Sequence, residues 1–246
     1  LMAKAVKKHG RVYTPNYIVN LILDFGGYKS SEILKKHVID NSCGDGAFLV
    51  EIVNRYCSTF LQTSNDISLL REELETYIHG IELDEVECKS CIKNLHQITD
   101  KYGVKDINWN ILNADTLTID QFNGKMDFVF GNPPYVRVHN LETSYDSVKK
   151  FKFAKDGMTD LFIVFFEIGF KMLAKEGVMC LITPSSWLSS LAGKTLREYI
   201  FLYHNLSGVI DLEHFQPFEA TTYTLISRFH NSKKFEQIEY FNFDED

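Results

Sequence analysis

The sequence feature that most constrains the fold is a short apolar strand that runs directly into a glycine-rich turn and then into a helix. The strand is predicted at residues 37–40, the turn at 41–46 and the start of the helix at 47–53. The turn carries Gly44 and Gly46, and glycine allows tight backbone conformations and close approach of a ligand because it has no Cβ. This order of elements is typical of the first unit of a Rossmann-like sheet.

Strands and helices alternate along the rest of the chain. Further strands are predicted at 78–84, 108–113, 126–130, 178–183, 207–212 and 222–227, and helices at 17–25, 86–95, 161–174 and 191–202. This alternation predicts an α/β fold with a mostly parallel, seven-stranded sheet and helices on both faces. A polar loop with several aromatic residues is expected at 136–159.

The bulk composition is that of an ordinary globular protein, with 45% hydrophobic and 24% charged residues. The longest apolar run, 161–170, is too short for a bilayer and contains Glu167, and the chain does not open on a signal-peptide pattern. We therefore expect a cytoplasmic protein with no membrane partner.

The five cysteines are odd in number and scattered, which favours reduced thiols over disulfides. Cys88 and Cys91 form a C-x-x-C pair, but neither a second pair nor nearby histidines complete a zinc site. We favour packing as their role and expect no metal site.

Polar or otherwise special residues follow four successive predicted strands. They are Asp40 with its glycine turn, Glu82, Asp115, and the tetrapeptide Asn132-Pro133-Pro134-Tyr135. Ligands of open α/β sheets bind beyond the carboxyl ends of the strands. Each acid alone could instead cap a following helix. Four consecutive strand ends that converge on one crevice favour a binding pocket.

The residues at these strand ends suit a nucleoside with a cationic centre. Glu82 can accept hydrogen bonds from two ribose hydroxyls, Asp115 can accept from an adenine amino group, and Asp40 lies near the positive end of the ligand. We therefore expect S-adenosyl-L-methionine as the cofactor. The cofactor-binding residues predicted at and around these strand ends are Asp40, Ser42, Gly44, Asp45, Gly46, Phe48, Glu82, Leu83, Asp115, Thr116 and Asn132.

The tetrapeptide at 132–135 is the most specific signal. Its prolines fix φ and remove two N–H donors, so the loop is rigid and its carbonyl groups remain acceptors. The side-chain carbonyl of Asn132 and the backbone carbonyl of Pro133 can both accept from one NH2 group and aim its lone pair at a methyl donor. Tyr135 offers a flat face for a planar group. A structural proline-rich turn is the less favoured alternative.

The blocks around these residues resemble the γ-type N6-adenine DNA methyltransferases of restriction–modification systems, those with the TaqI or Eco57I type of motif order. The resemblance covers about residues 13–229. It rests on Tyr13-Thr14-Pro15, on 40–49, 80–84 and 113–115, on the tetrapeptide, and on blocks at 160–177, 182–188 and 218–226. In the family the Thr-Pro segment packs over the methionine end of the cofactor, so the resemblance implies that Thr14 and Pro15 are also cofactor-binding residues.

The resemblance implies a Rossmann-like, S-adenosylmethionine-dependent methyltransferase that acts on N6 of an adenine flipped out of double-stranded DNA, as the modification component of a restriction–modification system. Flipping is needed because a stacked base is inaccessible to the cofactor. In the family a phenylalanine stacks on the base opposite the tyrosine, and we predict Phe218 for this role, with Phe215 as the fallback. Direct in-line transfer is expected, without a metal. The predicted catalytic residues are Asn132, Pro133, Pro134, Tyr135 and Phe218.

The charge and the end of the chain differ from what the family implies. Family members carry a target-recognition domain after the last block. In this chain we expect an N-terminal extension at 1–12, a catalytic domain at 13–232, and an edge strand or a connection to the absent target-recognition domain at 233–246. The net charge of −7 argues against a self-sufficient DNA-binding surface. A target-recognition domain and a fused or separate endonuclease are therefore expected partners besides DNA.

A local DNA-binding surface is predicted in the loop at 136–159. It would consist of Arg137, Lys149, Lys150 and Lys152, interleaved with Tyr145, Phe151 and Phe153. A solvated loop explains these residues equally well.

Two alternatives use the same residues differently. Protein-glutamine and RNA methyltransferases share the tetrapeptide, but Thr14-Pro15 and the block at 218–226 favour DNA. A non-catalytic specificity subunit that binds S-adenosylmethionine would keep the fold without turnover. The intact tetrapeptide and the full set of acids argue against it.

Overall fold

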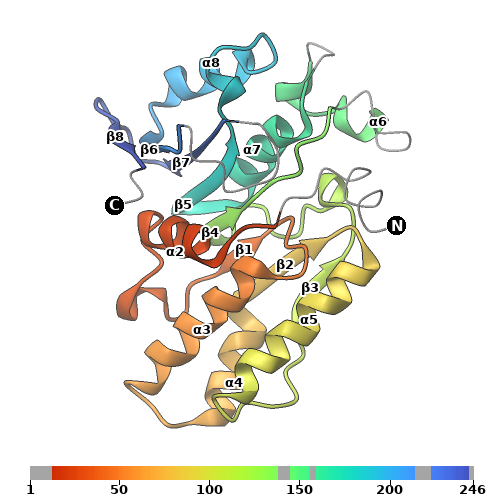
Figure 1. Cartoon of the computed structure of the whole chain (residues 1–246), viewed down its shortest axis with the longest axis vertical. Coiled ribbons are helices and arrows are strands. Elements are labelled where there is room, and N and C mark those ends of the chain that lie inside the picture. The colour runs from red at the N-terminus through yellow and green to blue at the C-terminus, as the bar shows by residue number, and fades with distance from the viewer. Residues whose placement is uncertain (1–12, 138–144, 156–158, 214–222, 244–246) are drawn as a thin grey trace.

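The computed structural model describes residues 13–137, 145–155, 159–213 and 223–243 of the chain. Its centre is an eight-stranded sheet, in the order β3-β2-β1-β4-β5-β7-β6-β8 (Figure 1). The strands are β1 (Val38–Asp40), β2 (Ile78–Glu82), β3 (Asn110–Asn113), β4 (Met126–Gly131), β5 (Leu173–Pro184), β6 (Leu206–Asp211), β7 (Thr224–His230) and β8 (Glu239–Asn242). β1 to β5 pair in parallel, and β7 runs antiparallel to β5 and β6.

Helices cover both faces of this sheet (Figure 1). One face carries α2 (Asn16–Phe25), α3 (Ala47–Leu61), α4 (Ile67–Tyr77) and α5 (Glu85–Asp100), and the other carries α7 (Leu161–Met172) and α8 (Lys194–Tyr203). In the described part of the chain, no helix has the length and apolar character needed to cross a bilayer.

The buried side chains form one apolar cluster on each face. Successive residues of the central strands alternate between the clusters, as the two-residue period of a strand requires. Val38 and Phe130 belong to the cluster under α2 to α5, whereas Ile39 and Val129 belong to the cluster under α7 and α8. The predicted α/β fold with a mostly parallel sheet covered on both faces is confirmed.

The sheet has one strand more than the seven predicted. The additional strand, β8, lies in the segment 233–246, for which an edge strand was one of the two expectations. It pairs in parallel with β6, and all four of its side chains are exposed. A strand with no buried side chain lacks the apolar alternation by which strands are recognised in a sequence.

The segment expected to be a polar loop is partly helical and packed. It contains α6 (Tyr145–Val148) and a 3₁₀ helix, η4 (Lys152–Ala154). Phe151 and Phe153 are buried in the cluster under α7. The interleaved phenylalanines therefore anchor this segment to the core and do not form a stacking surface for bases.

Two histidines lie at the amino ends of β1 and β2, at the edge of the sheet opposite the glycine turn. His37 Nδ1 is 2.9 Å from His79 Nε2, and Asn110 Nδ2 is 2.9 Å from His79 Nδ1. Burial, with a smaller contribution from His37, lowers the pKa of His79 from 6.5 to about 4.

We expect His79 to make the fold sensitive to acid. Its folded-state pKa lies below the unfolded value, so stability present above pH 6.5 is lost as the pH falls toward 4. This difference in pKa corresponds to about 3 kcal/mol. Between about pH 7.5 and about pH 4, urea denaturation should show that the wild type loses about 3 kcal/mol more than His79→Gln. The comparison cancels other titrating groups, and equal losses in the two proteins would contradict it.

Candidate active site

The glycine turn after β1 folds back against the end of β2. Gly44 and Gly46 both have positive φ, 54° and 93°, which other residues rarely adopt. A Cβ on Gly46 would lie 2.8 Å from Cys91 Sγ of α5. The backbone N–H of Gly44 donates to Glu82 Oε2 at 2.9 Å. Gly44 and Gly46 therefore hold the turn close to α5 and β2.

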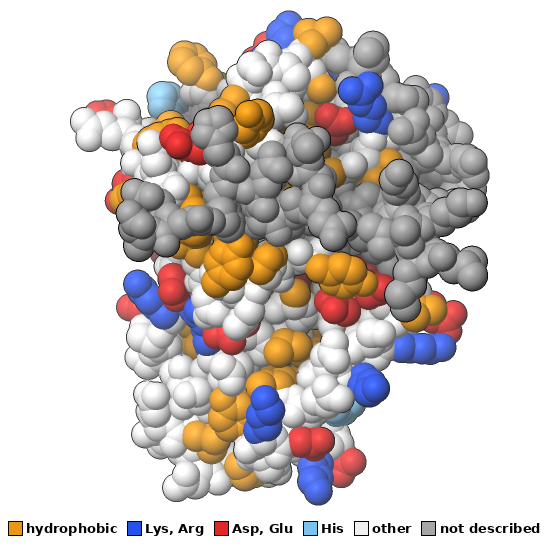
Figure 2. All heavy atoms as spheres, viewed as in Figure 1, with side chains coloured by type: hydrophobic (Ala, Val, Ile, Leu, Met, Phe, Trp, Pro, Cys, Tyr) orange, Lys and Arg blue, Asp and Glu red, His pale blue; other side chains and the backbone are white. Residues whose placement is uncertain are grey.

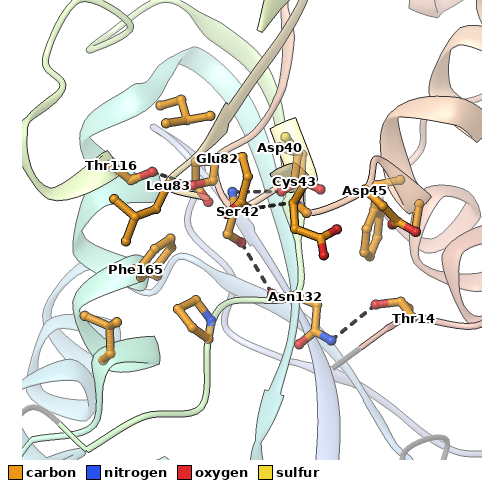
Figure 3. A pocket seen from close by; sticks show the side chains of 18 of the residues that line it. Thr14, Asp40, Ser42, Cys43, Asp45, Glu82, Leu83, Thr116, Asn132 and Phe165 are labelled. Carbon is orange, nitrogen blue, oxygen red and sulfur yellow. Dashed lines mark hydrogen bonds between the residues drawn. The ribbon is translucent and has the colours of Figure 1, made fainter. Parts of the chain in front are cut away.

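A cavity opens beyond the carboxyl ends of β1, β2, β3 and β4 (Figure 3). Most of the predicted cofactor-binding residues line it. They are Thr14, Asp40, Ser42, Gly44, Asp45, Phe48, Glu82, Leu83, Asp115, Thr116 and Asn132. Pro15 and Gly46 do not line it: Pro15 precedes the first turn of α2, and Gly46 lines a second hollow behind the turn.

The cavity is strongly acidic. Its lining carboxylates are Asp40, Asp45, Glu82, Glu87 and Asp115. Among the described residues that line it there is no lysine, arginine or histidine. A ligand with a pyrophosphate would be repelled, whereas a ligand with a cationic centre would be attracted.

Glu82 is nearly buried and joins two backbone segments. Its Oε2 accepts from Gly44, and its Oε1 accepts from the N–H of Asp84 at 2.7 Å. The carboxylate therefore sits in a fixed orientation at the cavity wall.

Asp40 is the most perturbed acid in the cavity. It is buried at the end of β1, and its Oδ1 accepts from the N–H of Ser42 at 3.0 Å. Burial raises its pKa to about 7, a rise that the Ser42 hydrogen bond reduces and the charge of Glu82 increases. A Cβ at position 131 would lie 2.9 Å from Asp40 Oδ1, so Gly131 is what allows β4 to pass this carboxylate. A cation in the cavity would restore the ionised form of Asp40.

Asp115 supports both of the interpretations weighed for the acids. Its Oδ1 accepts from the N–H of Leu117 at 3.0 Å and so caps the short helix η2 (Thr116–Thr118), while the residue also lines the cavity. Asp40 and Glu82 bind the glycine turn and the segment after β2 and do not cap a helix. Thr116 closes this side by donating to the carbonyl of Asn41 at 2.6 Å.

Asn132 stands where the cavity meets the N-terminal segment. Its Nδ2 donates to Thr14 Oγ1 at 3.2 Å, and its backbone carbonyl accepts from Ser42 Oγ at 3.4 Å. In Figure 3 the amide nitrogen points toward Thr14 and the amide oxygen points away from it. Residues that are 118 positions apart thus set the orientation of this side chain.

The other tetrapeptide residues divide around the cavity. Pro134 lines it, whereas Pro133 is buried and Tyr135 lies behind the lining. The Tyr135 hydroxyl donates to the carbonyl of Ile182 at 3.4 Å, and its ring meets that of Phe162 edge-on at 6.2 Å. The residue as a whole is partly exposed. Phe218 and Phe215 lie outside the described residues, so their stacking role remains a prediction.

Sequence reasoning missed part of the lining. Leu161 and Phe165 lie one turn apart on α7 and add an apolar wall. The signal was present, because this i, i+4 apolar pair lies within the block at 160–177. Tyr13 and Glu87 also line the cavity, and the Tyr13 hydroxyl donates to Glu87 Oε1 at 3.2 Å.

The predicted DNA-contacting residues lie apart from the cavity lining. Lys149, Lys150 and Lys152 are exposed on the packed segment that begins at residue 145. The backbone of Arg137 forms an isolated antiparallel β-bridge with that of Asp160. Figure 2 shows that, on the described surface of the face it draws, basic and acidic side chains are interspersed and no broad basic area forms. The DNA-binding role of these residues remains a prediction.

Comparison with known families identifies the chain. The family profile of the Eco57I restriction-modification methylase matches residues 46–218. The chain belongs to the Eco57I restriction-modification methylase family. The resemblance found in the sequence is confirmed.

Curated relatives are similar to this family member over most of its length. The type II methyltransferase M.BstVI of Geobacillus stearothermophilus is 31% identical over 89% of the chain and 42% of its own length. The type II restriction enzyme and methyltransferase RM.Eco57I of Escherichia coli is 27% identical over 87% of the chain and 27% of its own length. The chain thus spans less than half the length of these relatives.

Solved structures share the fold at low identity. A DrdV–DNA complex matches 97% of this chain and 28% of its own with a TM-score of 0.74 and 16% identity. A class I S-adenosylmethionine-dependent methyltransferase from Listeria monocytogenes matches 93% of this chain and 65% of its own with a TM-score of 0.70 and 16% identity. The predicted S-adenosylmethionine-dependent methyltransferase fold and its cofactor, S-adenosyl-L-methionine, are confirmed, and the acidic cavity fits a sulfonium ligand.

Cofactor affinity should depend on the ionisation of Asp40. With a pKa of about 7, Asp40 is neutral at lower pH, so affinity for the cationic cofactor should rise as the pH increases through 7. Calorimetry should show that S-adenosyl-L-methionine binds about tenfold more tightly at about pH 8 than at about pH 6. At the lower pH, binding should release the proton of Asp40.

Two controls separate this effect from general pH dependence. S-adenosyl-L-homocysteine has the same skeleton without the positive charge, so its affinity should change much less over the same range. Asp40→Asn should remove the dependence for the charged cofactor. An unchanged pH profile in Asp40→Asn would refute the role of this carboxyl.

Proposed function

We propose that this chain transfers the methyl group of S-adenosyl-L-methionine to N6 of an adenine flipped out of double-stranded DNA, as the modification component of a restriction–modification system. Membership of the Eco57I restriction-modification methylase family supports methylation of DNA. The nitrogen acceptor is proposed from the tetrapeptide at residues 132–135.

The position of Asn132 is the observation that carries this proposal. It lies at the rim of a cavity whose acids suit a sulfonium nucleoside, and Thr14 holds its amide nitrogen so that the amide oxygen faces away from the N-terminal segment. An amide oxygen in a fixed orientation can accept from an exocyclic NH2 group. A second acceptor, the Pro133 carbonyl, lies in the same rigid loop.

The cofactor supplies an electrophilic methyl group on a positively charged sulfur. Asp40 provides the negative charge that this end of the ligand requires, and Glu82 is oriented to accept from the ribose. Leu161 and Phe165 exclude water from the apolar wall of the cavity. Acceleration then comes mainly from holding acceptor and donor in line.

Asn132 acts on the acceptor nitrogen. By accepting hydrogen bonds from N6–H, it directs the nitrogen lone pair toward the methyl carbon. As the N–C bond forms and the S–C bond breaks, the positive charge passes from sulfur to N6, and the amide oxygen stabilises it. Loss of one proton from N6 to solvent completes the exchange. Tyr135, with Phe218 on the opposite side, would stack on the adenine, at about 1–3 kcal/mol per contact.

The expected partners follow from the length and the charge. The relatives M.BstVI and RM.Eco57I are more than twice as long as this chain and have room for a target-recognition domain. RM.Eco57I is named as both a restriction enzyme and a methyltransferase. A chain with a net charge of −7 would rely on such a domain for most phosphate contacts. Arg137, Lys149, Lys150 and Lys152 would add local contacts.

Transfer of a tritiated methyl group tests the acceptor. Supplied together with the target-recognition domain on which it is proposed to rely, the chain should label unmethylated plasmid DNA, and nuclease digestion followed by chromatography should place the label in N6-methyladenine. Release-factor protein and total RNA, offered in parallel, should remain unlabelled. Label in N4-methylcytosine or in glutamine would refute the adenine assignment.

Asn132→Ala tests the mechanism. Loss of the oriented acceptor should lower methyl transfer by about 10²–10³-fold. Affinity for S-adenosyl-L-homocysteine, measured by calorimetry, should change by less than about threefold, because the acids of the cavity remain. Thr14→Val removes the hydroxyl that orients Asn132 and should lower transfer less, while Thr14→Ser should retain it. Near wild-type transfer by Asn132→Ala would contradict this role.

A further inference from the structure

A loop with two exposed leucines lies at the carboxyl end of β5 and takes no part in the cofactor cavity. It comprises residues 185–193 and begins with the short helix η5 (Ser185–Leu188). Leu188 is 48% exposed and Leu191 is 71% exposed. Single exposed leucines are common on protein surfaces, so the position and rigidity of the loop decide what these two can do.

The loop starts beside the residues proposed to hold the target base. β5 runs parallel to β4 with Leu181 opposite Gly131, and the carbonyl of the next residue, Ile182, accepts from the Tyr135 hydroxyl. The N–H of Ser185 donates to the carbonyl of Tyr223 at 2.9 Å. Tyr223 directly follows the segment that contains Phe218. The first residue of the loop is therefore bound to Tyr223 and lies three residues after the carbonyl that accepts from Tyr135, one of the two proposed stacking partners.

Helix α7 gives a second measure of this proximity. Phe162 meets the ring of Tyr135 at 6.2 Å, and Phe166, one helical turn further along, meets the ring of Trp187 at 5.8 Å. Trp187 is buried and anchors the loop. The loop and the tetrapeptide thus pack on adjacent turns of one helix.

The loop is held in a fixed conformation. Arg197 Nη1 donates to the carbonyls of Trp187 and Ser190, at 2.7 Å and 2.8 Å. Ser190 Oγ accepts from the N–H of Gly193 at 3.2 Å. A Cβ on Gly193 would lie 2.1 Å from the Trp187 carbonyl, so the loop closes as tightly as glycine allows. A rigid loop presents its apolar side chains without an ordering cost on contact.

We propose that Leu191, supported by Leu188, inserts into the DNA duplex at the gap left by the flipped adenine. This inference rests on the proposed function. Removing a base from the stack costs a few kcal/mol, and apolar side chains offset that cost when they fill the gap between base steps. The exposed Ser186, Ser189 and Lys194 around the leucines suit the sugar–phosphate backbone on either side.

The test uses a duplex that already contains the gap. A labelled duplex of mixed sequence and the same duplex with one central abasic nucleotide are titrated with the chain in the presence of S-adenosyl-L-homocysteine, with fluorescence anisotropy as the readout. The variants are Leu191→Ala and the matched control Leu202→Ala. Leu202 is 67% exposed at the far end of α8. Methyl transfer to unmethylated plasmid DNA is measured in parallel.

The wild type and Leu202→Ala should prefer the abasic duplex about tenfold, and in Leu191→Ala this preference should fall to about twofold or less. Equal preference in the two variants, or no preference in the wild type, overturns the inference. The inference is also overturned if Leu191→Ala changes only the oligomeric state, measured by sedimentation velocity, because the leucine would then contact a second protein molecule. If no protein labels the plasmid even when the target-recognition domain is supplied, the proposed function fails as well. If labelling persists without a preference for the abasic duplex, only the inference fails.

Discussion

The carboxylate of Glu82 connects the two strands on which the cofactor site is built. It ends β2, accepts from Gly44 in the turn after β1, and accepts from Asp84 at the start of the following segment. These bonds can form only because β1 and β2 are parallel and in register, with Asp40 beside Gly80. The glycine turn is therefore placed by an acid that also lines the cavity, and the cavity is defined by sheet geometry more than by its loops.

The general fold follows from the sequence because its strands are strongly apolar. β1, β2 and β4 lie between two helical layers, so most of their residues are apolar and the positions of these strands can be predicted. Prediction from apolar residues fails at β8, because all of its side chains are exposed. It also fails in the segment of Phe151 and Phe153, because the helix there is too short to show a helical spacing of apolar residues. Tertiary packing against α7 decides the structure there.

The site was predictable where one strand end supplies one residue. Asp40, Glu82, Asp115 and Asn132 all follow strands whose carboxyl ends meet at one edge, so spacing alone brings them together. Phe165 and the Tyr13–Glu87 pair were not predicted, because they reach the cavity from a helix face and from the N-terminal segment. The orientation of Asn132 by Thr14 also depends on a contact across the chain, which local patterns do not encode.

The hydrogen bond between Thr14 and Asn132 has a consequence for how the protein becomes active during folding. The acids at the ends of β1 to β3 come together through strands that are close in sequence, whereas this bond closes a loop of more than a hundred residues. Closing a loop of that length costs about 1 kcal/mol more in chain entropy than bringing β1 and β2 together, and this cost must be met before the contact stabilises anything. A chain with its N-terminal segment detached would retain a formed cofactor pocket without a correctly oriented amide. Acceptor competence is thus expected to be the later and more easily lost property, reversible by docking one short helix.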